Sequence, residues 1–289
     1  MSLLRRTFLL GCAAPLARAA STPLAICSET FAGMNFAEAC KAARRTGYDG
    51  IEIEPAHLDA DPASLSPERR REIRRMMEGE GLRCPGLHSF LKAPAGLHLT
   101  TSDAAVRAKS WEYFARLVDL AADLADNPVM VLGSARQREA PAGASPRDAV
   151  ARLTEGLHGL RALAEPRRVC ILVEPLAPHL CNVVNTLAQA MEIVRAVDSP
   201  AVQTIFDTHN TAGETETAPE LVERHLPFIR HVHLNEMDGR RPGAGNYPFA
   251  TLLQALERLR YNGWLSVEVF DFKPDGETVA RLAREFLRN

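Results

Sequence analysis

The 289-residue chain is short of several features that would assign its class directly. Its net charge is only -2, so it lacks the basic surplus with which proteins bind nucleic acid or anionic membranes. Its six cysteines form no CxxC pair, and the five beyond residue 20 are interpreted as small buried hydrophobes. No GxGxxG motif follows a strand-like segment, which weakens a dinucleotide-binding interpretation. Because of this charge balance the expected partner is a small molecule. Beyond residue 20 no apolar run is long enough to span a bilayer.

The first twenty residues differ in composition from the rest of the chain. Arg5 and Arg6 precede a Thr-Phe-Leu-Leu segment and an alanine-rich apolar stretch that ends in small residues. This order describes an export signal, and the paired arginines resemble the twin-arginine type. We predict that residues 1–20 are the signal and 21–289 the mature domain, which would be periplasmic, or cytoplasmic if the signal is not functional. An ordinary secretion signal or an N-terminal tail is the alternative.

Strand-like and helix-like segments alternate along the mature chain. Strands are expected at 24–28, 50–54, 83–89, 129–132, 169–174, 202–207, 229–235 and 264–270. Helices are expected at 36–46, 67–80, 104–124, 146–164, 186–197, 218–225, 249–260 and 277–288. Eight strand-helix pairs in this length favour an α/β fold with a single domain, a closed (β/α)8 TIM barrel, over an open doubly wound sheet.

Four polar residues each close a short apolar run: Glu174 in VCILVEP, Asp207 in VQTIFD, His233 in IRHVHLNE and Glu268 in WLSVEVF. Their apolar neighbours would face the surrounding helices, so these side chains should face the barrel interior. They would then lie at the C-terminal ends of four consecutive strands, where barrel enzymes keep their active sites. Three carboxylates and one imidazole predict a site for one divalent metal ion, Mn, Mg, Co or Zn.

Such an ion would offset the repulsion among the three carboxylates and would polarise a bound hydroxyl or carbonyl group. The adjacent C–H bond would become more acidic as a result. A ligand carboxylate with a free oxygen could remove that proton, and one on the opposite side could return it.

Further polar residues surround the four predicted ligands. His209 follows Asp207 by two residues, His88 ends the third strand, and Arg240 follows His233 in sequence; we expect these three to bind substrate. A lone histidine is often an ordinary polar group, and Arg240 could belong to a solvated arginine pair. Two loops, 90–103 with Lys92 and 133–145, could cover the mouth. Other candidates are Glu29, Glu54 and His57, whereas His231 is expected to support the site or to be structural.

Six segments carry a family resemblance. VEPLAPHLCNVVNT, IFDTHN, IRHVHLNEMDGRRPGAGNYPF and GWLSVEVFDF resemble the sugar phosphate isomerase/epimerase family, xylose isomerase-like barrels that include ketose 3-epimerases and hydroxypyruvate isomerases. GYDGIEI and GLHSFLKAPAGLHLTT in the first half agree, so the resemblance covers nearly the whole mature chain.

The resemblance implies roles for single residues. The two glutamates of the ligand set would also be the acid/base pair on opposite faces of the substrate, which makes Glu174 and Glu268 the catalytic residues. Ketose 3-epimerases usually carry another glutamate where this chain has Leu180, so the specificity for free ketoses is in question. The implied metal ligands are Glu174, Asp207, His233 and Glu268, and the implied substrate contacts are His209 and Arg240.

Together these observations predict a metal-dependent sugar isomerase or epimerase acting on a ketose or keto-sugar by proton transfer next to a metal-bound carbonyl. One alternative is a lyase or dehydratase of keto-sugars or keto-glycosides, like inosose dehydratase, because it would need the same groups. A non-catalytic sugar-binding barrel is a second. A DNA-repair endonuclease of this barrel type would require a basic groove and extra histidine ligands. Export favours a free or oxidised sugar over a phosphorylated one, and homo-oligomerisation is left open.

Overall fold

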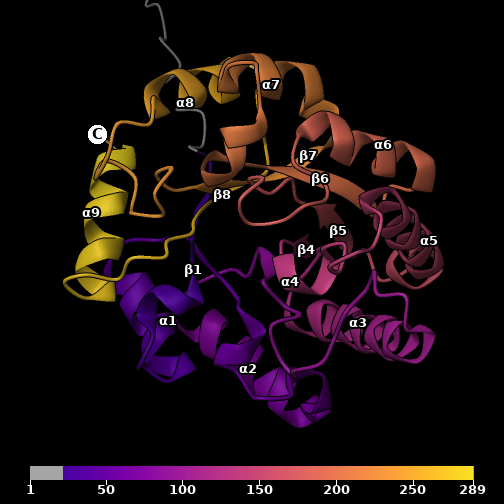
Figure 1. Ribbon diagram of the computed structural model, residues 1–289. Coiled ribbons are helices and arrows are strands. Elements are labelled where there is room, and N and C mark those ends of the chain that lie inside the picture. The colour runs from indigo at the N-terminus through magenta and orange to yellow at the C-terminus, as the bar shows by residue number, and fades with distance from the viewer. Residues whose placement is uncertain (1–21, 289) are drawn as a thin grey trace, which may run out of the picture.

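The computed structural model of the protein describes residues 22–288. The fold is an eight-stranded parallel barrel inside a ring of helices (Figure 1). The strands are β1 (Leu24–Cys27), β2 (Gly50–Glu52), β3 (Gly86–His88), β4 (Val129–Leu132), β5 (Cys170–Val173), β6 (Val202–Asp207), β7 (Ile229–Leu234) and β8 (Trp264–Val267). They pair in the order β2-β1-β8-β7-β6-β5-β4-β3. Two isolated parallel bridges, Gly50 with Arg83 and Ile53 with Leu87, join β2 to β3 and close the ring. The predicted (β/α)8 barrel with a single domain is confirmed.

The helices lie outside the strands (Figure 1). They are α1 (Phe36–Arg45), α2 (Pro67–Gly79), α3 (Ala104–Leu124), α4 (Ala135–Arg138), α5 (Pro146–Ala164), α6 (Leu187–Val197), α7 (Ala218–His225), α8 (Phe249–Arg258) and α9 (Gly276–Arg288). Short 3-10 helices are η1 (Ser28–Phe31), η2 (Pro55–His57), η3 (Pro62–Ser64), η4 (Thr208–Gly213) and η5 (Leu226–Phe228). Within residues 22–288, no helix combines the length and apolar character needed to cross a membrane. The predicted export signal, residues 1–20, lies outside the described residues.

Local capping signals explain why several helices begin where the sequence predicts. Asn35 and Glu38 form a reciprocal capping box at the start of α1, each side chain accepting the other's backbone N–H. Ser66 and Ser145 cap α2 and α5, and a proline follows each of them at the first helical position. These contacts satisfy N–H groups that the first helical turn would otherwise leave without partners.

Several predicted segments differ in extent from the structure, among them the expected strand 264–270, which shortens to β8. The expected strands 50–54 and 83–89 shorten to β2 and β3, because Pro55 and Pro85 have no N–H to donate to a strand ladder. The expected loop 133–145 contains the short helix α4. That loop therefore presents an ordered turn of helix at the barrel mouth instead of a simple connector.

Alternation along the strands separates two buried apolar regions. Ile171 and Val173 belong to the large core between the strands and the helices. Leu172 and Ile205 belong instead to a small cluster with Val129 and Val131, which fills the barrel interior. Side chains two residues further along a strand share a face, so the positions that follow Leu172 and Ile205 by two must also point inward. Those positions are occupied by carboxylates, directly above the apolar plug.

Candidate metal centre and substrate pocket

The structure brings the four predicted ligands together at the C-terminal ends of β5 to β8. Glu174 and Glu268 directly follow β5 and β8, Asp207 ends β6, and His233 lies one residue before the end of β7. The strand register pairs Asp207 with His233, which keeps neighbouring strand ends level. One ligand atom from each of the four residues lies within 4.8 Å of all the others. All four side chains are buried, so they form a compact cluster of donors with little contact with water.

The orientation of His233 supports a metal role. Its Nε2 donates to Glu52, at 3.2 and 3.3 Å from the two carboxylate oxygens. Its Nδ1 lies 3.1 Å from Glu268 Oε2 and 3.9 Å from Glu174 Oε1, yet it has no hydrogen-bond partner among the described residues. A buried nitrogen without a hydrogen bond is costly, and this one points at the carboxylates of Glu268 and Glu174. A divalent cation between these atoms fits that arrangement.

Charge repulsion within the cluster also indicates a metal site. Burial and the charges of Asp207 and Glu268 raise the pKa of Glu174 well above its usual range. Burial, and then the charge of Glu268, likewise raises the pKa of Asp207. Burial alone would also raise the pKa of Glu268, but the imidazoles of His233 and His88 outweigh it and hold that pKa low. Glu174 and Asp207 remain unfavourably placed as ionised groups despite these imidazoles, and a divalent ion would provide the missing positive charge.

Hydrogen bonds fix the carboxylate of Asp207. Its Oδ1 accepts the backbone N–H of His209 at 2.9 Å, and its Oδ2 accepts from the side chain of Asn210. His209 is held in turn, since its Nδ1 donates to the backbone carbonyl of Glu236 at 3.1 Å. The second nitrogen of His209 is therefore left as an acceptor on the side chain that faces the pocket.

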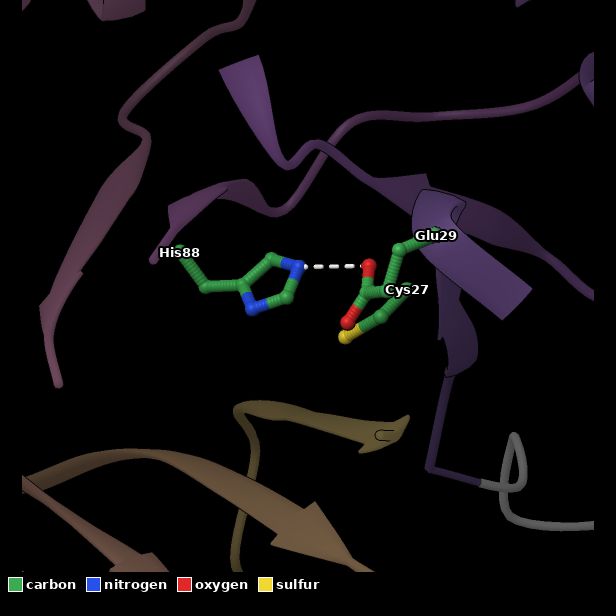
Figure 2. Close-up of side chains that lie close together, drawn as sticks. All are labelled: Cys27, Glu29 and His88. Atoms are coloured by element: carbon green, nitrogen blue, oxygen red, sulfur yellow. Dashed lines mark hydrogen bonds and ion pairs between the residues drawn. The ribbon is translucent and has the colours of Figure 1, made fainter. Parts of the chain in front are cut away.

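His88 supports Glu268 from behind. Its Nδ1 lies 3.1 Å from Glu268 Oε1. Its Nε2 lies 2.9 Å from Glu29 Oε2, and Figure 2 shows this second contact. The ring is 1% exposed, and the residues that line the pocket do not include it. The structure thus places His88 against a predicted catalytic carboxylate, while its expected contact with substrate stays a prediction.

A pocket of about 500 Å³ opens over the cluster. Glu174 and Glu268 line this pocket, whereas Asp207 and His233 do not. Both loops that were expected to cover the mouth contribute to its walls. The lining residues are Ser89, Lys92, Gly133, Ser134, Ala135, Arg136, Gln137, Glu174, Leu176, Leu180, His209, Asn210, Glu268 and Phe270.

The other candidates lie in different places. Arg240 is not among the lining residues; its Nε donates to Asp238 Oδ2 at 2.7 Å on an exposed turn after β7. Its expected substrate contact stays a prediction. The remaining contacts are Lys92 Nζ with Glu54 Oε1 at 3.0 Å, His57 Nε2 with the carbonyl of Met34 at 2.8 Å, and His231 Nε2 with Glu52 Oε2 at 2.8 Å.

Sequence reasoning missed two buried charged residues of the site. Glu52 is fully buried, and burial alone would raise its pKa, but His231 and His233 hold it well below the usual range. The sequence does mark Glu52, because it is the polar residue of the apolar run GIEI, just as each predicted ligand is in its own run. Arg138 on α4 is also fully buried and donates to the backbone carbonyl of Glu174. No strand pattern marks Arg138, since it lies in a connection between elements.

Comparison with known proteins gives the same fold. Residues 40–289 match the family model described as Xylose isomerase-like TIM barrel, and the chain belongs to this family. D-psicose 3-epimerase of Agrobacterium fabrum is 26% identical over 234 residues, covering 78% of this chain and 76% of that protein. A probable ketose 3-epimerase of Synechocystis is 24% identical over 269 residues, covering 85% and 88%. A structure of D-psicose 3-epimerase with D-fructose has a TM-score of 0.80 at 21% identity, covering 92% and 98%.

Replacing Glu52 should weaken metal binding without removing a ligand. In Glu52→Gln the amide cannot hold both imidazoles as the carboxylate does, so His233 loses its fixed tautomer and orientation. We expect about a 10- to 100-fold loss of Mn²⁺ affinity, measured by calorimetry. Glu54→Gln is the matched control, because Glu54 pairs with Lys92 and contacts no ligand histidine. Equal affinities in the two variants would contradict a supporting role for Glu52.

Gly133 should be required for the position of Glu174. A Cβ at Gly133 would lie 1.8 Å from Glu174 Oε2, so Gly133→Ala must displace that carboxylate. We expect Mn²⁺ affinity to fall at least about tenfold, which corresponds to roughly 1.4 kcal/mol. The melting temperature measured in chelator should change little, because only a side-chain end has to move. Gly159→Ala is the control, since nothing lies within 4 Å of its Cβ. Unchanged metal affinity in Gly133→Ala would argue against Glu174 as a ligand.

Proposed function

We propose that the protein is a metal-dependent isomerase or epimerase that acts on a ketose or keto-sugar by proton transfer at the carbon next to its carbonyl. The observation that carries the proposal is the division within the ligand set. Glu174 and Glu268 line the pocket, whereas Asp207 and His233 do not. The named activities of the relatives, D-psicose 3-epimerase and probable ketose 3-epimerase, support the same reaction class.

Glu174, Asp207, His233 and Glu268 would hold the ion, which when bound would stabilise negative charge developing on the substrate oxygen. Glu268 and Glu174 would move the proton, because each is both a ligand and part of the pocket wall. Their surroundings differ, because imidazole neighbours lower the pKa of Glu268 whereas burial and like charge raise the pKa of Glu174. A bound ion would favour the ionised form of both carboxylates, so that either could accept the substrate proton and return it.

Other lining residues would position the sugar. His209 offers a ring nitrogen to a hydroxyl group, since its other nitrogen is committed to the carbonyl of Glu236. The ring of Phe270 lies 5.1 Å from that of His209 and provides a flat apolar surface beside it. Leu180 lines the same pocket with 40% of its surface exposed, so this wall cannot hydrogen-bond a sugar hydroxyl. These contacts support a sugar with a less polar end as substrate.

Hydrogen exchange at carbon tests the reaction. The Mn²⁺-loaded protein, incubated with D-psicose, D-fructose, D-tagatose and L-ribulose in D2O, should incorporate deuterium next to the carbonyl and form the epimer or isomer. Glu268→Gln and Glu174→Gln should each lose about 100- to 10,000-fold in rate, the usual contribution of a general acid or base. Glu257→Gln on the exposed face of α8 is the control and should retain the parent rate.

Two other results would overturn the proposal. Release of a leaving group or formation of an enone would identify a lyase. Stoichiometric metal binding with neither exchange nor product, across these ketoses and their keto-glycosides, would identify a binding protein.

We also propose that residues 1–20 direct export of the folded protein to the periplasm by the twin-arginine route. The paired Arg5 and Arg6 before Thr-Phe-Leu-Leu support this proposal. Replacing both arginines with lysine should retain the chain in the cytoplasm with its signal uncleaved, measured by cell fractionation and intact mass. A cleaved periplasmic product from the double variant would indicate an ordinary secretion signal instead.

A further inference from the structure

A second group of potential ligands lies beside the first, at the ends of β1 and β3. Cys27 ends β1, Glu29 lies in the 3-10 helix η1 that follows, and His88 ends β3. One donor atom from each lies within 4.8 Å of the other two. Figure 2 shows the three side chains converging, with the His88 imidazole facing the carboxylate of Glu29 and the sulfur of Cys27 next to it. Chain segments far apart in sequence thus bring a thiol, a carboxylate and an imidazole to one point.

The surroundings of these side chains differ from those of an ordinary buried cysteine. Cys27 is fully buried and the Glu29 side chain is 14% exposed. The Cys27 sulfur lies 3.7 Å from the hydroxyl of Ser266, and a carboxylate oxygen of Glu52 and a ring nitrogen of His233 lie within 4.8 Å of it. A cation bound between Cys27, Glu29 and His88 would displace the thiol proton and offset the charge of the neighbouring carboxylates.

We propose that Cys27, Glu29 and His88 form a second divalent-metal site, selective for a thiophilic ion such as Zn²⁺. One sulfur, one nitrogen and one oxygen ligand leave a fourth tetrahedral position for water. The thiolate distinguishes this site from the Glu174 cluster, whose three carboxylates suit harder ions. The chain would then bind two ions of different preference a short distance apart.

The present spacing is close to what such an ion needs. His88 Nε2 and Glu29 Oε2 are 2.9 Å apart. Two tetrahedral zinc ligands with bonds of about 2.0 Å lie roughly 3.3 Å apart, so the pair has to separate by only a few tenths of an ångström. With Nε2 on the ion, Nδ1 of His88 can still donate to Glu268 Oε1, from which it is 3.1 Å away. The imidazole of His88 would then connect the second ion to a ligand of the first.

Cobalt binding tests the second site, because a cobalt-thiolate bond produces a charge-transfer absorption in the near ultraviolet that oxygen ligands do not. The protein, stripped with chelator, is titrated with Co²⁺ while this band and the stoichiometry are followed. We expect two equivalents and a band for the parent protein, but one equivalent and no band for Cys27→Ser. Cys84→Ser is the control, since the Cys84 sulfur has only the carbonyl of Gly86 as a partner, and it should retain both ions.

A further variant separates the two sites. Asp207→Asn should lose the ion of the first site and keep the thiolate band. If Asp207→Asn binds as the parent does while Cys27→Ser loses the band, the first site is wrong and the second stands. A band that persists in Cys27→Ser, or a parent protein that binds one equivalent without a band, overturns the second site. X-ray absorption of the Zn²⁺ form provides an independent measurement, because a sulfur neighbour must appear and must vanish in Cys27→Ser. Circular dichroism verifies that each variant is folded.

Discussion

Negative charge confined inside the barrel is the constraint on which the rest of the structure depends. Glu52, Glu174, Asp207 and Glu268 are all less than a tenth exposed. Carboxylates so placed cannot remain ionised without compensation, because burial and mutual repulsion both favour the neutral form. Imidazoles at fixed orientations and a buried guanidinium behind Glu174 compensate part of this negative charge. The space among the donors suits a divalent ion, which would compensate the rest. The apolar plug of Leu172, Ile205 and their neighbours keeps water from the other end.

The barrel supplies the geometry that this compensation needs. Parallel strands with level ends place each inward-facing terminal side chain beside that of the next strand, so convergence needs no special loop. The supporting contacts come from the opposite side of the ring. Glu52 on β2 holds His233 on β7, and His88 on β3 contacts Glu268 after β8. Strands far apart in the sheet order thus position the ligands, and only ring closure brings these strands face to face.

The barrel and its four strand-end ligands could be predicted from the sequence, because the pattern of apolar and polar residues within each strand marks them. A carboxylate at the end of an apolar run has few explanations, and the alternation around Glu174 and Asp207 indicates which way each side chain points. Contacts across the ring have no such signal. The bond of His88 to Glu268, the vacancy that Gly133 leaves for Glu174, and the guanidinium of Arg138 depend on which loops meet at the mouth. Glu52 is a different case, because the apolar residues on either side of it indicate that it points inward. Its partners His231 and His233 on β7 could not be predicted from that pattern.

The closure of the ring between β2 and β3 has a consequence for the ligands. Elsewhere neighbouring strands pair over three or four residues, whereas this seam has, among the described residues, two isolated bridges with four backbone hydrogen bonds across it. Glu52 lies on one side of the seam and His88 on the other, and these two residues hold His233 and Glu268 from behind. The bonds that close the wall therefore also fix the distance between the two supports, so a change in the wall at this seam would move a ligand on the far side of the barrel.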